Sequence, residues 1–257
     1  MDISVIIVTY NSGVFVKNCI ESILSNNNIY KKEIILVDNG SVDSTIRIAA
    51  SFKSAIRIIK NVKNLGYAAG NNIGRRCSKG KNVLILNPDI VLGHDFIANI
   101  LEFLESDQHI GIIGPKLLYP DNRIQESCRK FYSIRTIIMR RTIFGKLFPQ
   151  SKYLKEHLMS DWDRNSVRDV DWVLGACMLM RRASIEKLGY FDEGYRLYFE
   201  DVDLCYRMHK SGLRVVYNPN IICIHHHQRE SAKRFNKQTY WHIQSGIRFF
   251  RKHGWRM

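Results

Sequence analysis

Short, continuous hydrophobic runs alternate along the first half of the chain with longer segments in which hydrophobic residues recur every three or four positions. The runs are rich in β-branched and aliphatic residues, which predicts strands buried on both faces. They lie at Ile3–Val8, Ile34–Val37, Ile56–Ile59, Val83–Leu86 and Ile110–Ile113. The periodic segments predict amphipathic helices at Val14–Leu24, at Asp43–Phe52 with Asp43 as N-cap, and at Phe96–Leu104. This alternation predicts a Rossmann-like α/β fold with a mostly parallel open sheet and helices on both faces.

The pattern is less regular in the second half. Phe131–Phe148 mixes apolar and basic residues, and Val173–Met180 is an apolar run interrupted by a glycine and an alanine. Ile221–Ile224 has the character of a strand that leads into three successive histidines. Phe235–Lys252 combines helical spacing with a basic and aromatic character. We therefore expect one continuous domain that ends in a helical extension.

Polar residues and glycines follow each of the first four predicted strands. They lie at Thr9–Asn11, Asp38–Ser41, Asn64–Gly74 and Asn87–Asp89. Ligands bind at the carboxyl ends of the strands in open α/β sheets. We therefore expect all four clusters to meet at one ligand-binding edge.

Each cluster also has a purely structural interpretation. Asp38 can accept a hydrogen bond from a nucleobase or a ribose, but Asp-Asn-Gly-Ser is also good turn chemistry. The three glycines of Asn64–Gly74 would let the backbone approach a ligand, and a helix start there would suit phosphate. A tight loop before a helix is the alternative, since neither a Walker loop nor a GxGxxG pattern is present. Asp89 can bind Mg²⁺ or Mn²⁺, or it can close a proline turn.

The sharpest local signal is Glu200-Asp-Val-Asp203, where three carboxylates fall within four residues after the aromatic stretch Tyr195–Phe199. Clustered acids repel one another, so at least one pKa should be raised unless a cation lies nearby. A carboxylate beside an aromatic wall is a credible general base for a hydroxyl, and an acidic first helical turn is the alternative.

One imidazole of His225–His227 is a candidate metal ligand. Structural zinc is disfavoured because no CxxC or HxxxH spacing occurs, and a solvated histidine cluster is the other alternative.

Composition narrows the class of protein. The chain has 257 residues, 45% of them hydrophobic, so it can bury a proper core. Its formal net charge of +15 is uneven, with +3 on residues 1–116 and +12 on residues 117–257. A basic second half suits nucleic acid, an acidic membrane surface or a phosphate-bearing substrate. No run reaches the roughly 18 apolar residues of a membrane span, and the six cysteines form no CxxC pair. The sequence thus predicts a reduced, cytoplasmic protein without a transmembrane anchor or signal peptide.

Taken in order, these motifs resemble those of the family 2 glycosyltransferases, which have the GT-A fold, and especially their bacterial rhamnosyltransferase-like branch. The matching motifs are Val8–Asn11, Val37–Thr45, Asn64–Gly74, Leu86–Asp89, Val173–Ala176, Gly189–Glu193, Phe199–Leu204, and His225 followed by Gln228–Ser231. Each motif alone is moderately specific, whereas the ordered set is highly specific. The resemblance implies a donor-binding part at residues 1–116, an acceptor-binding and catalytic part at 117–231, and a basic aromatic helix at 232–257, all within one GT-A domain.

The resemblance also implies roles for individual residues. Asp201 matches the family's general base, with Glu200 as the acid beside it. Asp89 matches the last aspartate of the metal-binding DxD motif, and His225 matches a further ligand for Mn²⁺ or Mg²⁺. Asn87 stands where many members have the first aspartate, which leaves one fewer ionic ligand.

Two further sets of residues follow from the resemblance. Trp172 and Gly175 fall where the acceptor pocket begins. Asp38 is implied to contact the pyrimidine base of the donor. The positions implied to bind the nucleotide sugar are Thr9, Asn11, Asp38, Asn39, Asn64, Gly66, Gly70, Asn71 and Asn87.

The implied reaction is a single inverting displacement. Asp201 removes the proton of an acceptor hydroxyl, and the oxygen attacks the anomeric carbon opposite the departing nucleoside diphosphate. The branch favours dTDP-rhamnose as donor, with UDP-hexoses as the alternative. The implied acceptor is a saccharide, often lipid-linked, in the biosynthesis of O-antigen or capsule polysaccharide.

A lipid-linked acceptor would explain the basic second half. Phe131–Phe148 and Phe235–Trp255 could then lie on the anionic inner face of the cytoplasmic membrane. The alternative is a pair of ordinary amphipathic helices that pack on the core.

Two other classes of protein fit less well. The charge would suit a nucleic-acid-binding module, but the chain shows no recognisable DNA or RNA motif, and we expect no nucleic-acid partner. A nucleotidyltransferase should carry a glycine-rich signature with a basic residue near the N-terminus, and Val8–Asn11 shows none.

Overall fold

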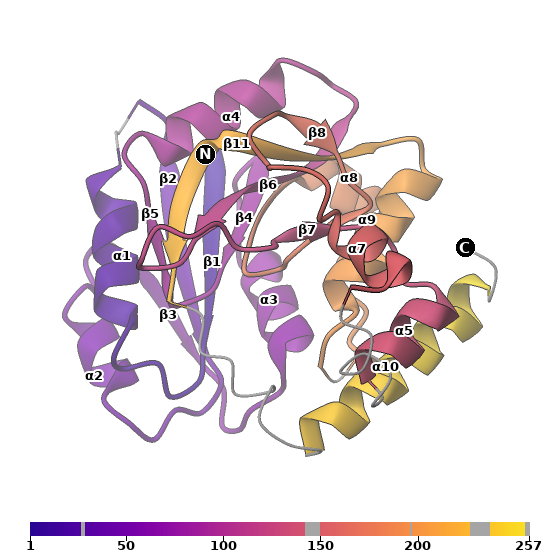
Figure 1. Cartoon of the computed structure of the whole chain (residues 1–257). Coiled ribbons are helices and arrows are strands. Elements are labelled where there is room, and N and C mark those ends of the chain that lie inside the picture. The colour runs from indigo at the N-terminus through magenta and orange to yellow at the C-terminus, as the bar shows by residue number, and fades with distance from the viewer. Residues whose placement is uncertain (27–28, 142–149, 196, 227–236, 255–257) are drawn as a thin grey trace.

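The computed structural model describes residues 1–26, 29–141, 150–195, 197–226 and 237–254. Strands and helices alternate in the first half, as the sequence predicts (Figure 1). The elements there are β1 (Ile3–Thr9), α1 (Val16–Ser25), β2 (Lys32–Asp38), α2 (Thr45–Ala50), β3 (Arg57–Lys60), α3 (Tyr67–Arg76), β4 (Asn82–Leu86), β5 (Ile90–Leu92), α4 (Phe96–Glu105) and β6 (Ile110–Leu118).

The second half contains shorter strands and more helix. Its elements are β7 (Cys128–Arg129), α5 (Ile134–Arg141), α7 (Lys152–Leu158), β8 (Arg168–Asp169), β9 (Trp172–Val173), β10 (Cys177–Arg181), α8 (Arg182–Leu188), α9 (Glu200–Lys210), β11 (Arg214–His225) and α10 (Lys237–His253). Among the described residues, no helix is both long enough and apolar enough to cross a membrane.

The central sheet has the strand order β3-β2-β1-β4-β10-β6-β11-β5, with β8 beside β11. Strands β3, β2, β1 and β4 are parallel, and so are β6 and β11. Strand β10 runs antiparallel between β4 and β6. The predicted α/β class with a largely parallel central sheet is confirmed, and the antiparallel insertion of β10 is a feature that the sequence pattern did not predict.

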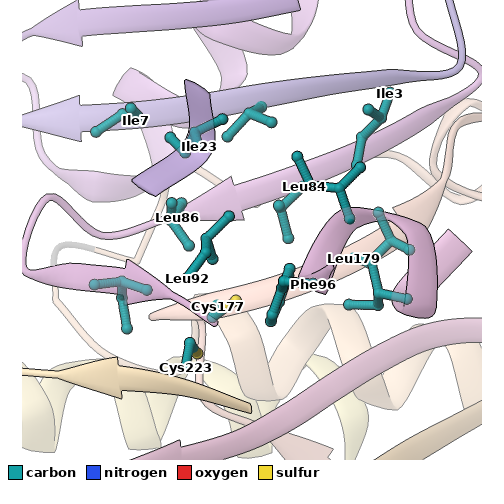
Figure 2. Close-up of a cluster of buried hydrophobic side chains, with 14 of the residues drawn as sticks. Ile3, Ile7, Ile23, Leu84, Leu86, Leu92, Phe96, Cys177, Leu179 and Cys223 are labelled. Carbon is teal, nitrogen blue, oxygen red and sulfur yellow. The ribbon is translucent and has the colours of Figure 1, made fainter. Parts of the chain in front are cut away.

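Alternate residues of β1 point to opposite faces of the sheet. Ile3, Val5 and Ile7 join a core that includes residues of α1 and α4, whereas Ile6 joins a second core with residues of α3, α8, α9 and α10. Figure 2 shows the first core, where Phe96 of α4 lies against the sheet. Helices therefore cover both faces, as expected.

The glycines of Asn64–Gly74 differ from the expected open loop, because α3 begins at Tyr67 and contains two of them. A Cβ at Gly70 would lie 2.7 Å from Val8 Cγ1, and a Cβ at Gly74 would overlap the Ile6 side chain. These two glycines let α3 pack closely on β1 instead of exposing backbone to a ligand.

The helix at Asp43–Phe52 is also shorter than predicted: Ser44 holds the N-cap position of α2, and Asp43 Oδ1 accepts the Thr45 N–H at 2.9 Å.

The irregular second half resolves into distinct elements. Val173–Met180 forms the end of β9 and most of β10 on either side of a turn at residues 174–176, and Ile221–Ile224 is the end of the longer strand β11. Helix α5 occupies part of Phe131–Phe148, and α10 occupies most of Phe235–Lys252. Residues 142–149 and 227–236 lie outside the described residues. Helix α10 runs beside α5 at the edge of the molecule (Figure 1).

Candidate active site

Asp38 links the carboxyl ends of β1 and β2. Its side chain is only 2% exposed. Its Oδ1 accepts the Thr9 hydroxyl at 2.9 Å and the Ser41 hydroxyl, and its Oδ2 accepts the Ser41 N–H at 3.0 Å. These donors fix the carboxylate and leave acceptor capacity on Oδ2 for a ligand.

Asn39 connects this edge to the start of α3. Its Nδ2 donates to Gly66 O at 3.1 Å, and its Oδ1 accepts from Asn61 Nδ2 at 2.8 Å. Gly66 precedes α3 with a φ of 88°, and its N–H donates to Asn64 Oδ1 at 2.9 Å. That backbone conformation favours glycine, so Gly66 is the one glycine of the segment that is needed for its φ.

Asn11 completes the edge from β1. It has a φ of 51°, a conformation in which asparagine is enriched among non-glycine residues. Its N–H donates to Ser41 Oγ at 2.9 Å, and its Oδ1 accepts the Val42 N–H at 3.0 Å. The polar clusters after β1, β2 and β3 therefore meet at one edge, as the sequence predicted.

Gly70 and Asn71 lie farther along α3. Asn71 is 1% exposed, and its Nδ2 donates to Tyr67 O at 3.0 Å. Gly70 faces Val8 of β1. Both positions serve the packing of the helix on the sheet, and their contact with a donor stays a prediction.

Asp89 and His225 face each other at the end of β4 and β11. Asp89 Oδ1 lies 3.4 Å from His225 Nε2. His225 Nδ1 lies 2.8 Å from Gln125 Oε1, and Gln125 Nε2 donates to His225 O at 2.9 Å. Because Gln125 Oε1 can only accept, the ring proton resides on Nδ1 and Nε2 turns toward Asp89.

This pair suits a divalent cation. Asp89 Oδ1 is buried and has no hydrogen-bond partner among the described residues. A carboxylate oxygen and an imidazole nitrogen at this separation are both ligand atoms for Mn²⁺ and Mg²⁺. Gln125 orients His225 as outer residues commonly orient ligand histidines. Within the described part of the chain, no cluster of three or more acidic, histidine or cysteine side chains is arranged to hold a metal. The remaining ligands would therefore have to come from a substrate.

Asp201 lies in the first turn of α9, opposite the turn at residues 174–176. Its Oδ2 accepts the Gly175 N–H at 3.0 Å, and its Oδ1 accepts the Val202 N–H at 2.9 Å. Burial raises the pKa of Asp201 above its ordinary value, while these two N–H groups and Arg129 oppose that rise. The carboxylate is thus held in a fixed direction, as a general base requires.

Glu200 differs sharply from its neighbour. Its side chain is 7% exposed, and Oε2 has no hydrogen-bond partner within the described residues. Burial, and then the charge of Asp201, raise the pKa of Glu200 to about 8. The expectation that clustered acids carry a raised pKa is confirmed here. With this pKa, Glu200 is mostly protonated at neutral pH.

The turn at residues 174–176 joins the separate parts of the site. Gly175 N–H binds Asp201, and Ala176 O accepts the Asn87 N–H at 2.8 Å. Gly175 O accepts the hydroxyl of Tyr67, the first residue of α3. Burial raises the pKa of Tyr67 well above its ordinary value, so its hydroxyl stays a donor. The polar edge formed by the ends of β1 to β3, the Asp89–His225 pair and Asp201 are connected through this one turn.

Trp172 lies in β9, two residues before the start of this turn. It is 3% exposed, its indole N–H donates to Lys130 O at 3.0 Å, and the Arg129 guanidinium lies 5.2 Å from the ring centroid. Little of the ring is left to meet an acceptor, so contact of Trp172 with an acceptor stays a prediction. Gly175 lies at the site itself, where a Cβ would approach the Tyr67 hydroxyl to 2.9 Å.

Sequence reasoning missed three residues that shape the site, namely Tyr67, Gln125 and Arg129. Gln125 and His225 are 100 positions apart, and Tyr67 and Gly175 are 108 apart. No local pattern connects such pairs. The aromatic residue within Asn64–Gly74 was the only available signal, and it gave no indication of its partner.

A buried carboxylate pair and an Asp–His pair along one edge of an α/β sheet define an enzyme site, and comparison with known proteins identifies the class. The family model described as glycosyl transferase family 2 matches residues 4–189. The chain therefore belongs to glycosyltransferase family 2 and is an enzyme of the hexosyltransferase class.

Similar sequences place the chain near rhamnosyltransferases. It is 29% identical over 240 residues to the N-acetylglucosaminyl-diphospho-decaprenol L-rhamnosyltransferase of Mycobacterium tuberculosis, covering 89% of this chain and 77% of the relative. It is 29% identical over 255 residues to the rhamnosyltransferase WbbL of Escherichia coli K12, covering 95% and 91%. The predicted rhamnosyltransferase-like branch, with its polysaccharide-biosynthesis relatives, is confirmed.

Solved structures confirm the fold. The Pyrobaculum calidifontis mannosyltransferase PcManGT, solved with GDP-mannose and Mn²⁺, matches with a TM-score of 0.64 at 19% identity over 97% of this chain and 63% of its own. GalNAc-T7, solved with UDP, GalNAc and Mn²⁺, matches with a TM-score of 0.72 at 15% identity over 98% and 48%. This chain spans about half to two-thirds of these solved chains.

Proposed function

We propose that this protein transfers L-rhamnose from dTDP-rhamnose, with inversion, to a hydroxyl of a lipid-linked saccharide. The observation that supports this most is the turn at residues 174–176, which holds Asp201 on one side and the Asn87–Asp89 segment on the other. A general base and a metal-binding pair that are joined by one short turn suit a reaction in which a hydroxyl displaces a diphosphate at a single carbon atom. The similarity to two rhamnosyltransferases favours the sugar.

The donor occupies the carboxyl edge of β1 to β4. Asp38 Oδ2 accepts from the pyrimidine, and the segments around Thr9, Asn11 and Asn39 surround the nucleoside. Asn64, Gly66 and Asn87 line the path of the diphosphate and the sugar toward Asp89. This division assigns residues 1–116 to the donor and residues 117–231 to catalysis and the acceptor.

Asp89 and His225 would hold Mn²⁺ or Mg²⁺ together with oxygens of the donor diphosphate. When bound, such an ion neutralises the negative charge that grows on the leaving group. The chain contributes the fixed directions of both ligands, through the backbone of β4 for Asp89 and through Gln125 for His225.

Asp201 removes the proton from the acceptor hydroxyl. The freed oxygen forms a bond to the anomeric carbon while the bond from that carbon to the diphosphate oxygen breaks, and dTDP departs. Gly175 and Val202 hold the base in its direction during this step. Glu200 stays protonated and does not compete for the acceptor proton.

The acceptor is an N-acetylglucosaminyl-diphospho-polyprenol or a similar lipid-linked saccharide in cell-surface polysaccharide biosynthesis. One relative is named for that acceptor class. The net charge of +12 on residues 117–257 suits an anionic lipid pyrophosphate and the inner face of the cytoplasmic membrane.

The function is tested with purified protein, Mn²⁺, dTDP-rhamnose and a synthetic N-acetylglucosaminyl-diphospho lipid. We expect release of dTDP and a rhamnosylated product by mass spectrometry. Asp201→Asn should lower kcat by roughly 10²- to 10⁴-fold, because it removes the base, and should leave dTDP affinity by calorimetry nearly unchanged. Glu186→Gln, an exposed change on α8, is the control.

Three contrary results would each refute a different part of the proposed function. Normal turnover of Asp201→Asn would refute the base assignment. Release of UDP from a UDP-hexose, with dTDP-rhamnose inert, would refute the donor. Release of pyrophosphate would show a nucleotidyltransferase instead.

A further inference from the structure

The two residues before the acid pair have an unusual backbone. Tyr198 has a φ of 63° and Phe199 a φ of 70°, and Phe199 holds the N-cap position of α9. A positive φ at a bulky aromatic residue is strained and persists only where surrounding contacts impose it. The direction in which Glu200 and Asp201 leave this turn therefore depends on whatever holds it.

Helix α10 supplies aromatic contacts to this turn, in addition to Tyr132, whose ring centroid lies 4.8 Å from that of Phe199. Phe249, which is fully buried, lies 5.5 Å from the Phe199 ring between centroids. His242, 5% exposed, lies 5.0 Å from the ring of Tyr198 and 5.2 Å from that of Phe199. Ring contacts of this kind stabilise a packed pair beyond the area that they bury.

Helix α10 also binds the turn and α9 through polar groups. Ser245 Oγ donates to Leu197 O at 2.9 Å, just before the two strained residues. One turn into α9, Asp203 is fully buried, and its Oδ1 lies 2.8 Å from Lys252 Nζ and 2.7 Å from His253 Nε2. Leaving a buried carboxylate without its cations is costly, so Asp203 fixes the end of α10 to the helix that carries the base.

We propose that α10 is a positioning element for catalysis, in which Ser245 and Phe249 hold the Tyr198–Phe199 turn and thereby aim Asp201 at the acceptor hydroxyl. This inference rests on the proposed role of Asp201 as the base. Ser245 contacts Leu197 and Phe249 contacts Phe199, so we expect their effect on chemistry to pass through the turn.

The test compares Ser245→Ala and Phe249→Ala with the exposed control Gln244→Ala on the same helix. In the rhamnosyl transfer assay, both positioning variants should lose between about 10- and 100-fold in kcat, because small displacements of a catalytic group have effects of that size. The KM for dTDP-rhamnose and the calorimetric affinity for dTDP with Mn²⁺ should stay within about twofold of wild type. Phe249→Leu should recover most of the lost kcat.

Amide hydrogen exchange gives a second readout that needs no turnover. Exchange at residues 197–203 should accelerate in Ser245→Ala and remain at the wild-type rate in Gln244→Ala, while β1 and β4 stay protected in both. If Phe249→Ala fails to fold, the milder Ser245→Ala decides.

The outcomes separate the two proposals. A wild-type protein without transferase activity refutes the proposed function, and the exchange rates at 197–203 then decide alone whether α10 supports the turn. Unchanged kcat in Ser245→Ala, or a parallel loss of kcat and dTDP affinity, overturns the positioning role and leaves α10 as ordinary packing.

Discussion

Glu200 and Asp201 are neighbours in the chain, yet they differ in what surrounds their carboxyl groups. Both oxygens of Asp201 accept a backbone N–H, whereas Glu200 is buried with an oxygen that has no partner within the described residues. Burial raises the pKa of both acids, and the N–H groups of Gly175 and Val202 oppose that rise at Asp201. Two neighbouring carboxyl groups in such different surroundings can take different roles.

The raised pKa of Glu200 makes stability depend on pH. The group binds a proton in the folded protein up to about pH 8, but only up to about 4.5 when unfolded, so the free energy of unfolding falls as pH rises between those values. We expect Glu200→Gln to melt higher than wild type at pH 8, with a gap that shrinks toward pH 5. Thermal unfolding across that range measures it.

The transferase activity of the Glu200 variants is the control for this stability measurement. Glutamine resembles the protonated acid, so Glu200→Gln should retain most of kcat at pH 7, whereas Glu200→Ala, which leaves a cavity beside the base, should lose more. A Glu200→Gln variant with the pH-dependent stability of wild type would show that Glu200 is ionised in the folded protein.

The Asp89–His225 pair gives a prediction about metal. Asp89→Ala removes the ionic ligand, so dTDP affinity in the presence of Mn²⁺ should fall by about tenfold or more, while affinity in EDTA should barely change. Isothermal calorimetry with and without Mn²⁺ measures both. Equal loss in the two conditions would indicate that Asp89 contacts the nucleotide and not a cation.

At the scale of elements, the packing of α3 on the sheet depends on the small residues of its inner face. Gly70 and Gly74 let the helix backbone approach Val8 and Ile6 of β1. This close packing places Tyr67 where its hydroxyl reaches Gly175 O. The two glycines therefore affect the site by setting the position of α3 and, with it, the position of Tyr67.

Gly74→Ala should destabilise the protein by roughly 1–3 kcal/mol, because the added methyl group overlaps Ile6 in a packed interior. Gly246→Ala is the matched control. A Cβ there would meet only ordinary contacts at 3.4 Å or more, and alanine favours a helix interior, so this change should be neutral or stabilising. Urea unfolding measures both, and equal effects would contradict the packing argument.

The elements that sequence predicts well are those with a strong local pattern. Strands β1 and β4 are buried runs, and α1 and α4 have clear apolar faces, so each was predicted within a few residues. Strands β5, β7, β8 and β9 have two or three residues each, too few for any periodicity. Their positions depend on partners far along the chain, as do those of Gln125 and Arg129 beside the candidate site. Asp38, Asp89 and Asp201 could be proposed from sequence because each lies in a recognisable motif, and their roles stay predictions.

At the scale of the whole molecule, α10 has two different faces. One packs on α9 through Phe249, and the other exposes Tyr240, Ile247 and Arg251 to solvent. Lys252 lies between them and binds Asp192 and Asp203. Core packing, one of the two sequence interpretations of this segment, therefore holds for one side of α10, and membrane contact stays a prediction for the other side.

The exposed face should bind anionic vesicles. We expect co-sedimentation with phosphatidylglycerol vesicles at low salt, weakened by high salt. The double change Tyr240→Ser and Ile247→Ser should reduce the bound fraction by about tenfold, because it removes two apolar contacts. Val62→Ser, a change at a fully exposed apolar residue elsewhere, should have no effect. No binding by wild type at low salt would reject membrane contact.

The antiparallel strand β10 has a consequence for how the protein is made. It fills the gap between β4 and β6, yet it is synthesised more than fifty residues after both. A nascent chain that has emerged only through residue 118 therefore presents unpaired edges on both β4 and β6, which are sites of association with other chains. The sheet is completed only when β10 and then β11, residues 177–181 and 214–225, have left the ribosome, so the parts of the chain before and after residue 116 form one folding unit.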